Sequence, residues 1–234
     1  MSEETKTVAA EAPVEKKGVV VEFDFTVANG AEILYKTTEK VLGDNDIPFS
    51  PRVEAQHLSG GNYQGGLAEY FAIVKTKKTA PKVAKDIAEA FASAMTKAFA
   101  GAVTEDFKTF LRKLLDKGLK VVVSTRADMK VAQNVLAEFV GNENFVLSQE
   151  TSMTYGSVKW DAWRRTTATS HLRSCMTLAV TGSGFGVKGA LLAGMGVVAV
   201  MNDRVAWQDF GGVDEVLDKL DSQAADVIAH ILRV

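Results

Sequence analysis

Five short apolar runs, separated by helical patterns, constrain the fold of this chain more than any other feature. They cover Val19–Asp24, Leu119–Ser124, Phe145–Ser148, Met176–Thr181 and Gly196–Met201. The runs are apolar throughout instead of alternating apolar and polar, which is typical of strands buried on both faces. Strands that alternate with helices form a parallel sheet covered by helices on both faces. The sequence therefore predicts an α/β fold with a Rossmann-like, doubly wound parallel sheet as its core.

The helices of this core are predicted from the spacing of their apolar residues. In Glu105–Lys117 the apolar positions recur as they do on one face of a helix, and Gly118 stands where a C-terminal cap belongs. Further core helices are predicted at Met129–Phe139, Lys159–Ser170, Val187–Ala193 and Asp214–Leu232.

The segment between the first two predicted strands contains no convincing strand of its own. Helices are predicted at Glu32–Leu42, Leu67–Val74 and Lys82–Phe99, with prolines and paired glycines between them. A helical block inserted after the first strand predicts a small all-helical cap domain over the end of the sheet. We therefore expect a Rossmann-like core over residues 18–30 and 101–234, a helical cap over 31–100 and a disordered tail over 1–17.

Composition excludes several classes of function and indicates a compartment. The net charge is −2, which predicts no affinity for nucleic acid or for a membrane surface. No apolar run approaches the roughly 18 residues that a membrane helix needs. The chain has one cysteine, Cys175, expected to be a small buried apolar residue, so a disulfide framework is excluded and a reducing compartment is indicated. The cytoplasm is the predicted location.

Two acidic residues close the first predicted strand. Glu22 and Asp24 are separated by Phe23, so strand alternation predicts that both carboxylates lie on one side. Ligands of open α/β sheets bind outside the carboxyl ends of the strands. A carboxylate pair there is typical of a site for a hard cation and an acid/base step. The alternative is that the two acids only cap a strand-to-helix loop, and spacing leaves both interpretations open.

Four segments carry a resemblance to a known family. EFDFTVAN matches the signature DxDGTxxD at Asp24 and Thr26, and LKVVVSTR matches a strand ending in Ser or Thr at Ser124. GVKGALLAGMGVVAV and HLSGGNYQGGLAEYF are similar to the closing helix and strand and to the cap of the same family. From Gly18 to Leu232 the chain resembles the haloacid dehalogenase superfamily, in particular its capped, phosphatase-like branch.

The resemblance implies a set of roles for the matching residues. In the family the first aspartate attacks phosphate to form an aspartyl phosphate, and the second protonates the leaving group. A hydroxyl and a lysine hold the phosphate, and later acids complete a Mg²⁺ site. Carried over, Glu22 stands at the nucleophile and Asp24 at the acid/base, and both would be ligands of the metal. The residues that would bind a phosphorylated ligand are Thr26, Ser124, Thr125, Lys159, Thr181, Gly182 and Ser183.

This sequence departs from the family pattern at the chemical positions. Glu22 is longer than aspartate by one methylene, and a misplacement of about 1 Å can cost ~10²-fold in rate. Phe25 replaces the glycine of DxDGT. The family has one or two acids just after the fourth strand, and Thr181 and Gly182 replace them here. Mg²⁺ is therefore expected to bind weakly or not at all. For the phosphate-binding lysine two alternatives remain. Ser157 stands at the aligned position, and Lys159 lies two residues later.

A glycine-rich turn supports a rival interpretation. TGSGFGVKG contains the spacing GxGxxG at Gly184, Gly186 and Gly189, after a predicted strand and before a predicted helix. That context is typical of a dinucleotide-binding turn. Two features count against this interpretation. Two residues lie between the end of the strand and Gly184, and a nucleotide-binding half built on this strand would have only one further strand before the chain ends. A turn that holds an anion through its backbone N–H groups is the favoured interpretation.

Two functional hypotheses remain from the sequence. The first is a haloacid dehalogenase-like protein with impaired or lost phosphatase chemistry, which binds a small anionic ligand or a protein partner between cap and core. The second is a divergent Mg²⁺-dependent phosphohydrolase acting on a small phosphorylated metabolite. Arg126 follows the second strand at the same sheet edge and is a candidate contact for an anionic ligand.

Overall fold

The computed structural model describes residues 16–58, 63–150 and 159–234. Residues 1–15 of the predicted tail lie outside this part of the chain. The remaining two residues of that segment contact the core. Lys16 Nζ donates to the Asn144 side chain at 2.7 Å, and Lys17 Nζ donates to the Leu232 carbonyl at 2.7 Å.

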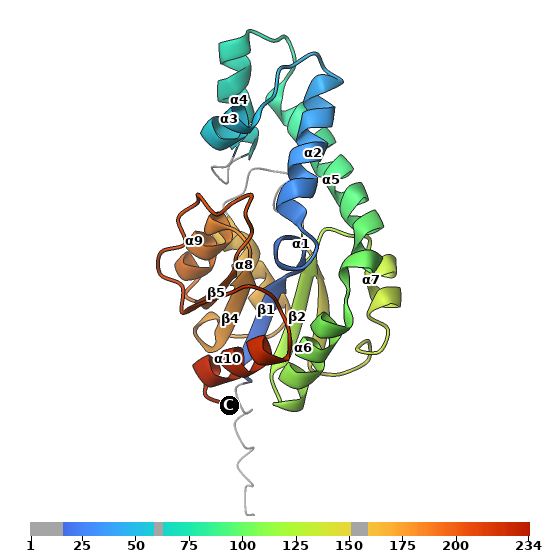
Figure 1. Ribbon diagram of the computed structural model, residues 1–234, viewed down its shortest axis with the longest axis vertical. Coiled ribbons are helices and arrows are strands. Elements are labelled where there is room, and N and C mark those ends of the chain that lie inside the picture. Colours follow the sequence, from blue (N-terminus) through green and yellow to red (C-terminus); the bar gives the residue numbers. More distant parts are fainter. Residues whose placement is uncertain (1–15, 59–62, 151–158) are drawn as a thin grey trace, which may run out of the picture.

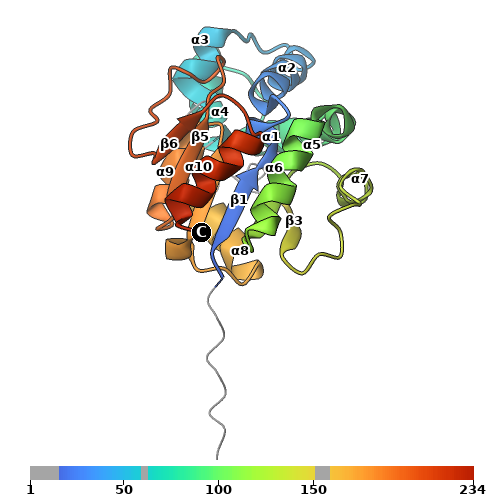
Figure 2. The ribbon, with the colours of Figure 1, turned by 60° about the horizontal axis from the view of Figure 1, so that its bottom comes forward.

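A parallel sheet forms the core, as predicted, but it has six strands where the sequence predicts five (Figures 1 and 2). Its order is β3-β2-β1-β4-β5-β6, so β1 lies in the middle between β2 and β4. The register places Glu22 of β1 opposite Ser124 of β2. The strands are β1 (Gly18–Glu22), β2 (Lys120–Thr125), β3 (Phe145–Gln149), β4 (Thr177–Thr181), β5 (Gly196–Val200) and β6 (Glu215–Leu217).

Helices cover both faces of this sheet. Apolar residues of α6 and α10 pack with Val19 and Val21 of β1, whereas those of α8 and α9 pack with Val20 on the opposite face. Alternate residues of one strand thus enter two separate apolar clusters, because successive side chains of a strand point to opposite faces. The core helices are α1 (Phe23–Thr26), α6 (Glu105–Asp116), α7 (Met129–Val135), α8 (Lys159–Thr169), η3 (Ser174–Met176), α9 (Gly184–Leu192) and α10 (Ser222–Leu232).

The cap is helical and has an apolar cluster of its own, which includes Leu42, Leu67 and Ile87. Its helices are α2 (Gly30–Gly43), α3 (Pro51–Val53), η1 (Glu54–Leu58), α4 (Tyr63–Val74) and α5 (Ala80–Ala102). Figure 1 shows α4 and the start of α5 beyond the carboxyl ends of the strands, with the rest of α5 running down beside the core. The domain boundary at residues 100 and 101 stays a prediction.

Two details of the core differ from the sequence prediction. Where a single helix over Asp214–Leu232 is predicted, the structure has the short strand β6, a turn and α10. Asp221 is the N-cap of α10 and accepts hydrogen bonds from two backbone N–H groups. Cys175 is exposed instead of buried, because it lies in η3 before β4 enters the sheet. Among the described helices, none has the length and apolar character required to cross a membrane.

Candidate functional site

The carboxylate of Glu22 is held by a hydroxyl from the neighbouring strand. Glu22 ends β1 and Thr181 ends β4, and both side chains are buried. Thr181 Oγ1 donates a hydrogen bond to Glu22 Oε2. Gly186 of α9 lies against this pair, since a Cβ there would stand 1.8 Å from Thr181 Oγ1 and 3.1 Å from Glu22 Oε2. The carboxylate of Glu22, which the sequence resemblance places at the nucleophile, is therefore bordered by Thr181 and by the start of α9.

Asp24 does not lie on the strand, which corrects the predicted alternation. β1 ends at Glu22, and the next four residues form the helical turn α1. Asp24 is completely buried and accepts three hydrogen bonds, from Thr125 Oγ1 at 2.6 Å and from Arg126 N and Nη1 at 3.0 Å each. Burial raises the pKa of the Asp24 carboxyl, and the Arg126 guanidinium and the Thr125 hydroxyl oppose that rise. Both oxygens of this carboxylate are thus engaged by the chain itself.

The other predicted hydroxyls lie at the same edge of the sheet. Thr26 Oγ1 donates to the Glu22 carbonyl at 2.8 Å, a bond to the residue four positions earlier that belongs to the helical turn. Ser124 is buried at the end of β2 beside Glu22. Thr125 both donates to Asp24 and accepts from Ala127 N at 3.1 Å. The structure therefore gathers these hydroxyls at the edge where Glu22 and Asp24 lie, and that of Thr125 bonds to a carboxylate.

The glycine-rich turn packs tightly against its own chain. A Cβ at Gly182 would stand 2.0 Å from the Phe25 carbonyl oxygen, and one at Gly184 would stand 2.6 Å from the Asp209 carbonyl oxygen. Gly184 N donates to Gln208 Oε1 at 2.8 Å. These close approaches and bonds explain Gly182 and Gly184 without a bound dinucleotide.

Ser183 is the N-cap of α9 and accepts from Gly186 N at 3.0 Å. One of the backbone N–H groups that would hold an anion at this turn is therefore engaged by the cap. Lys159 begins α8, but its side chain, like Ser157, lies outside the described residues, so the choice between them stays a prediction.

The donor set at this edge does not fit Mg²⁺. Magnesium requires near-octahedral oxygen ligands and is usually held by one or two carboxylates. Here Glu22 accepts from a hydroxyl, and the Arg126 guanidinium already pairs with Asp24 at 3.0 Å, where it would repel a second cation. Within residues 16–58, 63–150 and 159–234, no group of three or more His, Cys, Asp or Glu side chains is placed to hold a metal.

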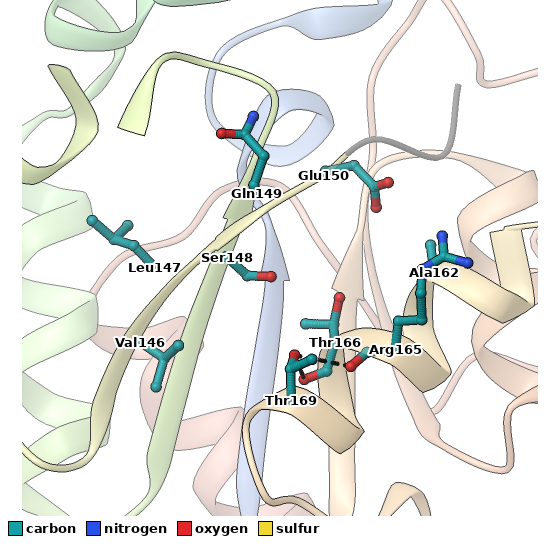
Figure 3. Close-up of a pocket in the computed structure, with 9 residues that line it drawn as sticks. All are labelled: Val146, Leu147, Ser148, Gln149, Glu150, Ala162, Arg165, Thr166 and Thr169. Carbon is teal, nitrogen blue, oxygen red and sulfur yellow. Dashed lines mark hydrogen bonds between the residues drawn. The ribbon is translucent and has the colours of Figure 1, made fainter. Parts of the chain in front are cut away.

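A cavity of about 420 Å³ lies elsewhere, between β3 and α8 (Figure 3). Figure 3 shows Ser148 pointing from β3 toward Thr166 on α8, with Glu150 and Arg165 beyond them. Neither Glu22 nor any of the hydroxyls described above lines it.

A second space, of about 610 Å³, lies where the loop after β5 meets α2. Arg204 lines it and joins core to cap, with Nε 3.4 Å from Glu32 Oε2 and Nη2 3.5 Å from Glu54 Oε2. Its guanidinium carbon lies 3.5 Å from the centre of the Tyr35 ring. Asn202 also donates to Asn29 at 2.9 Å. These contacts close one side of the interface between cap and core.

The sequence pattern does not predict the partner of Arg126. Its position after β2 suggests a contact with an anionic ligand, whereas its partner in the structure is Asp24, more than a hundred positions earlier. One signal could have indicated this pair. Arg126 comes just after β2, and an acid, Asp24, comes two residues after the neighbouring strand β1.

Comparison with known proteins agrees with this architecture. The model of the haloacid dehalogenase-like hydrolase family matches residues 19–200. No curated protein matches the chain. A β-phosphoglucomutase from Clostridium difficile is 13% identical with a TM-score of 0.66, over 93% of this chain and 97% of that one.

Two further solved structures are similar over most of both chains. A phosphonoacetaldehyde hydrolase-like protein from Oleispira antarctica has 15% identity and a TM-score of 0.65, over 96% of this chain and 97% of its own. CbbY from Rhodobacter sphaeroides, solved in complex with phosphate, has 14% identity and a TM-score of 0.60, over 88% and 95%. At such identities the likeness concerns the fold, while the family match covers most of the sequence. This chain belongs to the haloacid dehalogenase-like hydrolase family.

Proposed function

We propose that this chain is a haloacid dehalogenase-like protein that has lost phosphate-ester hydrolysis and binds a small anionic ligand between cap and core. The observation that carries the proposal is the engagement of both carboxylates by the chain's own donors. Thr181 donates to Glu22, and Thr125 and Arg126 donate to Asp24. A nucleophile and an acid/base must be free to meet the substrate in the correct protonation state.

The geometry of the turn after β4 also supports lost hydrolysis. Phosphoryl transfer depends mainly on positioning and on cations that stabilise the developing charge. Where the family has metal-binding acids, Thr181 is turned to Glu22, and Gly182 has no room for a side chain against Phe25. Neither Thr181 nor Gly182 thus offers a carboxylate that would hold such a cation close to Glu22.

The donors at the same edge favour an anionic ligand. Arg126 supplies a buried positive charge, and Ser124 supplies a hydroxyl beside Glu22. The related CbbY structure contains phosphate, which agrees with an ancestry of phosphate binding. Because this edge has donors for an anion but no acids directly after β4 to hold a metal, it favours binding of an anion over its hydrolysis. A protein partner at the same interface, and the cytoplasmic location, stay predictions.

A phosphatase assay tests this proposal. We expect the wild-type chain to hydrolyse a panel of phosphate monoesters, with and without Mg²⁺, no faster than its Glu22→Gln and Asp24→Asn variants. Equal rates in all three proteins identify any remaining signal as background. Mg²⁺-dependent hydrolysis by the wild type that either substitution abolishes would show that the chain is a divergent phosphohydrolase and that the proposal is wrong.

A further inference from the structure

The guanidinium of Arg126 has an unused hydrogen-bonding edge inside the protein. The side chain is 5% exposed and pairs with Asp24 through Nη1. Its Nε and Nη2 atoms are buried, and neither has a hydrogen-bond partner within the part of the chain that the structure describes. A buried donor without an acceptor is costly, so it is rarely retained without a reason.

This edge has a shape that suits one class of ligand. The N–H groups of Nε and Nη2 point the same way and match two oxygens of a carboxylate or phosphate. Elsewhere in this chain, Arg112 directs the same two atoms to Glu138 Oε2, at 3.0 and 2.6 Å. The Nε and Nη2 edge of Arg112, on the exposed surface, thus has the kind of acceptor that the same edge of Arg126 lacks among the described residues. In the interior such charged hydrogen bonds are stronger, because the surroundings are less polar.

Two aromatic rings border the guanidinium. Its carbon atom lies 5.8 Å from the centre of the Phe25 ring and 5.7 Å from that of Phe91. Such contacts stabilise a cation but provide no oxygen to accept the two N–H groups. Phe91 is fully buried in the core cluster, whereas Phe25 is only partly buried and lies on the short turn α1. Of the two rings, Phe25 is therefore the one nearer the protein surface.

We propose that the Nε and Nη2 edge of Arg126 binds one oxyanion group of a ligand, a carboxylate or a phosphate, which enters past Phe25. The inference rests on the proposed function and names the residue and the chemistry that carry it. The guanidinium supplies the positive charge, so no divalent metal is needed. Binding satisfies two buried donors that the described residues leave unpaired.

Titrations with inorganic phosphate and with acetate test this inference, in the full chain, at constant ionic strength and without divalent metal. Calorimetry measures affinity, and NMR follows the arginine Nε–H signals. We expect saturable binding of at least one anion, tighter in Phe25→Ala, with a shift of the Arg126 signal. Arg126→Lys keeps the charge but loses the two-pronged edge, so affinity should fall about tenfold or more. Arg112→Lys is the matched control and should bind as the wild type does.

The outcomes separate this inference from the proposed function. Unchanged anion affinity in Arg126→Lys, with an unmoved Arg126 signal, overturns the role of Arg126 and leaves anion binding elsewhere in the molecule. Absence of binding of both anions to the wild type and to Phe25→Ala also overturns it. Thermal unfolding checks that Arg126→Lys is folded, and if it is not, Phe25→Ala and the Nε–H signal still decide. The phosphatase assay reports separately on lost hydrolysis.

Discussion

Replacing Asp24 with alanine is expected to lower the free energy of unfolding by about 3–5 kcal/mol. Asp24 is fully buried, and it is the acceptor for the Arg126 guanidinium and for the Thr125 hydroxyl. Without it, a positive charge remains in an apolar enclosure formed in part by Phe25 and Phe91. Urea unfolding at neutral pH, followed by circular dichroism, measures the effect.

A double variant provides the control for this prediction. Asp24→Ala combined with Arg126→Met removes both charges, and the loss should be smaller than the sum of the two single losses. A loss within about 0.5 kcal/mol for Asp24→Ala alone is what a surface substitution gives, and it would contradict the pairing described here.

Gly182→Ala is the second substitution with a large expected effect. The added Cβ would stand 2.0 Å from the Phe25 carbonyl oxygen, which is backbone and cannot rotate away. We expect a loss of about 3 kcal/mol, at the upper end of what overpacking costs. For the same reason, Gly182→Asp should destabilise the fold instead of restoring a metal ligand. Thermal and urea unfolding of both variants measure these losses.

Gly101→Ala is the matched control for the glycine substitution. Gly101 lies in α5, and a Cβ there meets nothing within 4 Å. Alanine is favoured over glycine in a helix by roughly 0.5–1 kcal/mol, so this variant should be at least as stable as the wild type. Equal stability of Gly182→Ala and wild type would show that the turn does not pack against α1 as described.

The central strands could be predicted because they are apolar and buried on both faces. Val19–Val21 and Val121–Val123 have no exposed surface, so apolar runs alone identify them. β6 could not be found in this way, because it is three residues long and largely exposed at the sheet edge. Gly118 was correctly placed as the end of α6, and its positive φ of 75° explains why glycine stands there.

The sequence predicts that the candidate residues gather at one sheet edge, but it does not predict their contacts. Glu22, Ser124 and Thr181 gather at one sheet edge because they end parallel strands that lie side by side. The orientation of Asp24 depends on a helical turn that begins one residue after Glu22, and strand periodicity cannot foresee that turn. The pairing of Asp24 with Arg126 joins two loops and leaves no local pattern in the sequence.

A calorimetric titration of Mg²⁺ into the full-length chain most directly tests whether these carboxylates are held by the chain's own donors. We expect no saturable binding by the wild type, because Thr181 and Arg126 already engage Glu22 and Asp24. A Glu22→Asp, Thr181→Asp double variant, which exchanges the donor for a carboxylate, is the positive control and should bind Mg²⁺. Saturable Mg²⁺ binding by the wild type that Glu22→Gln abolishes would contradict this description of the site.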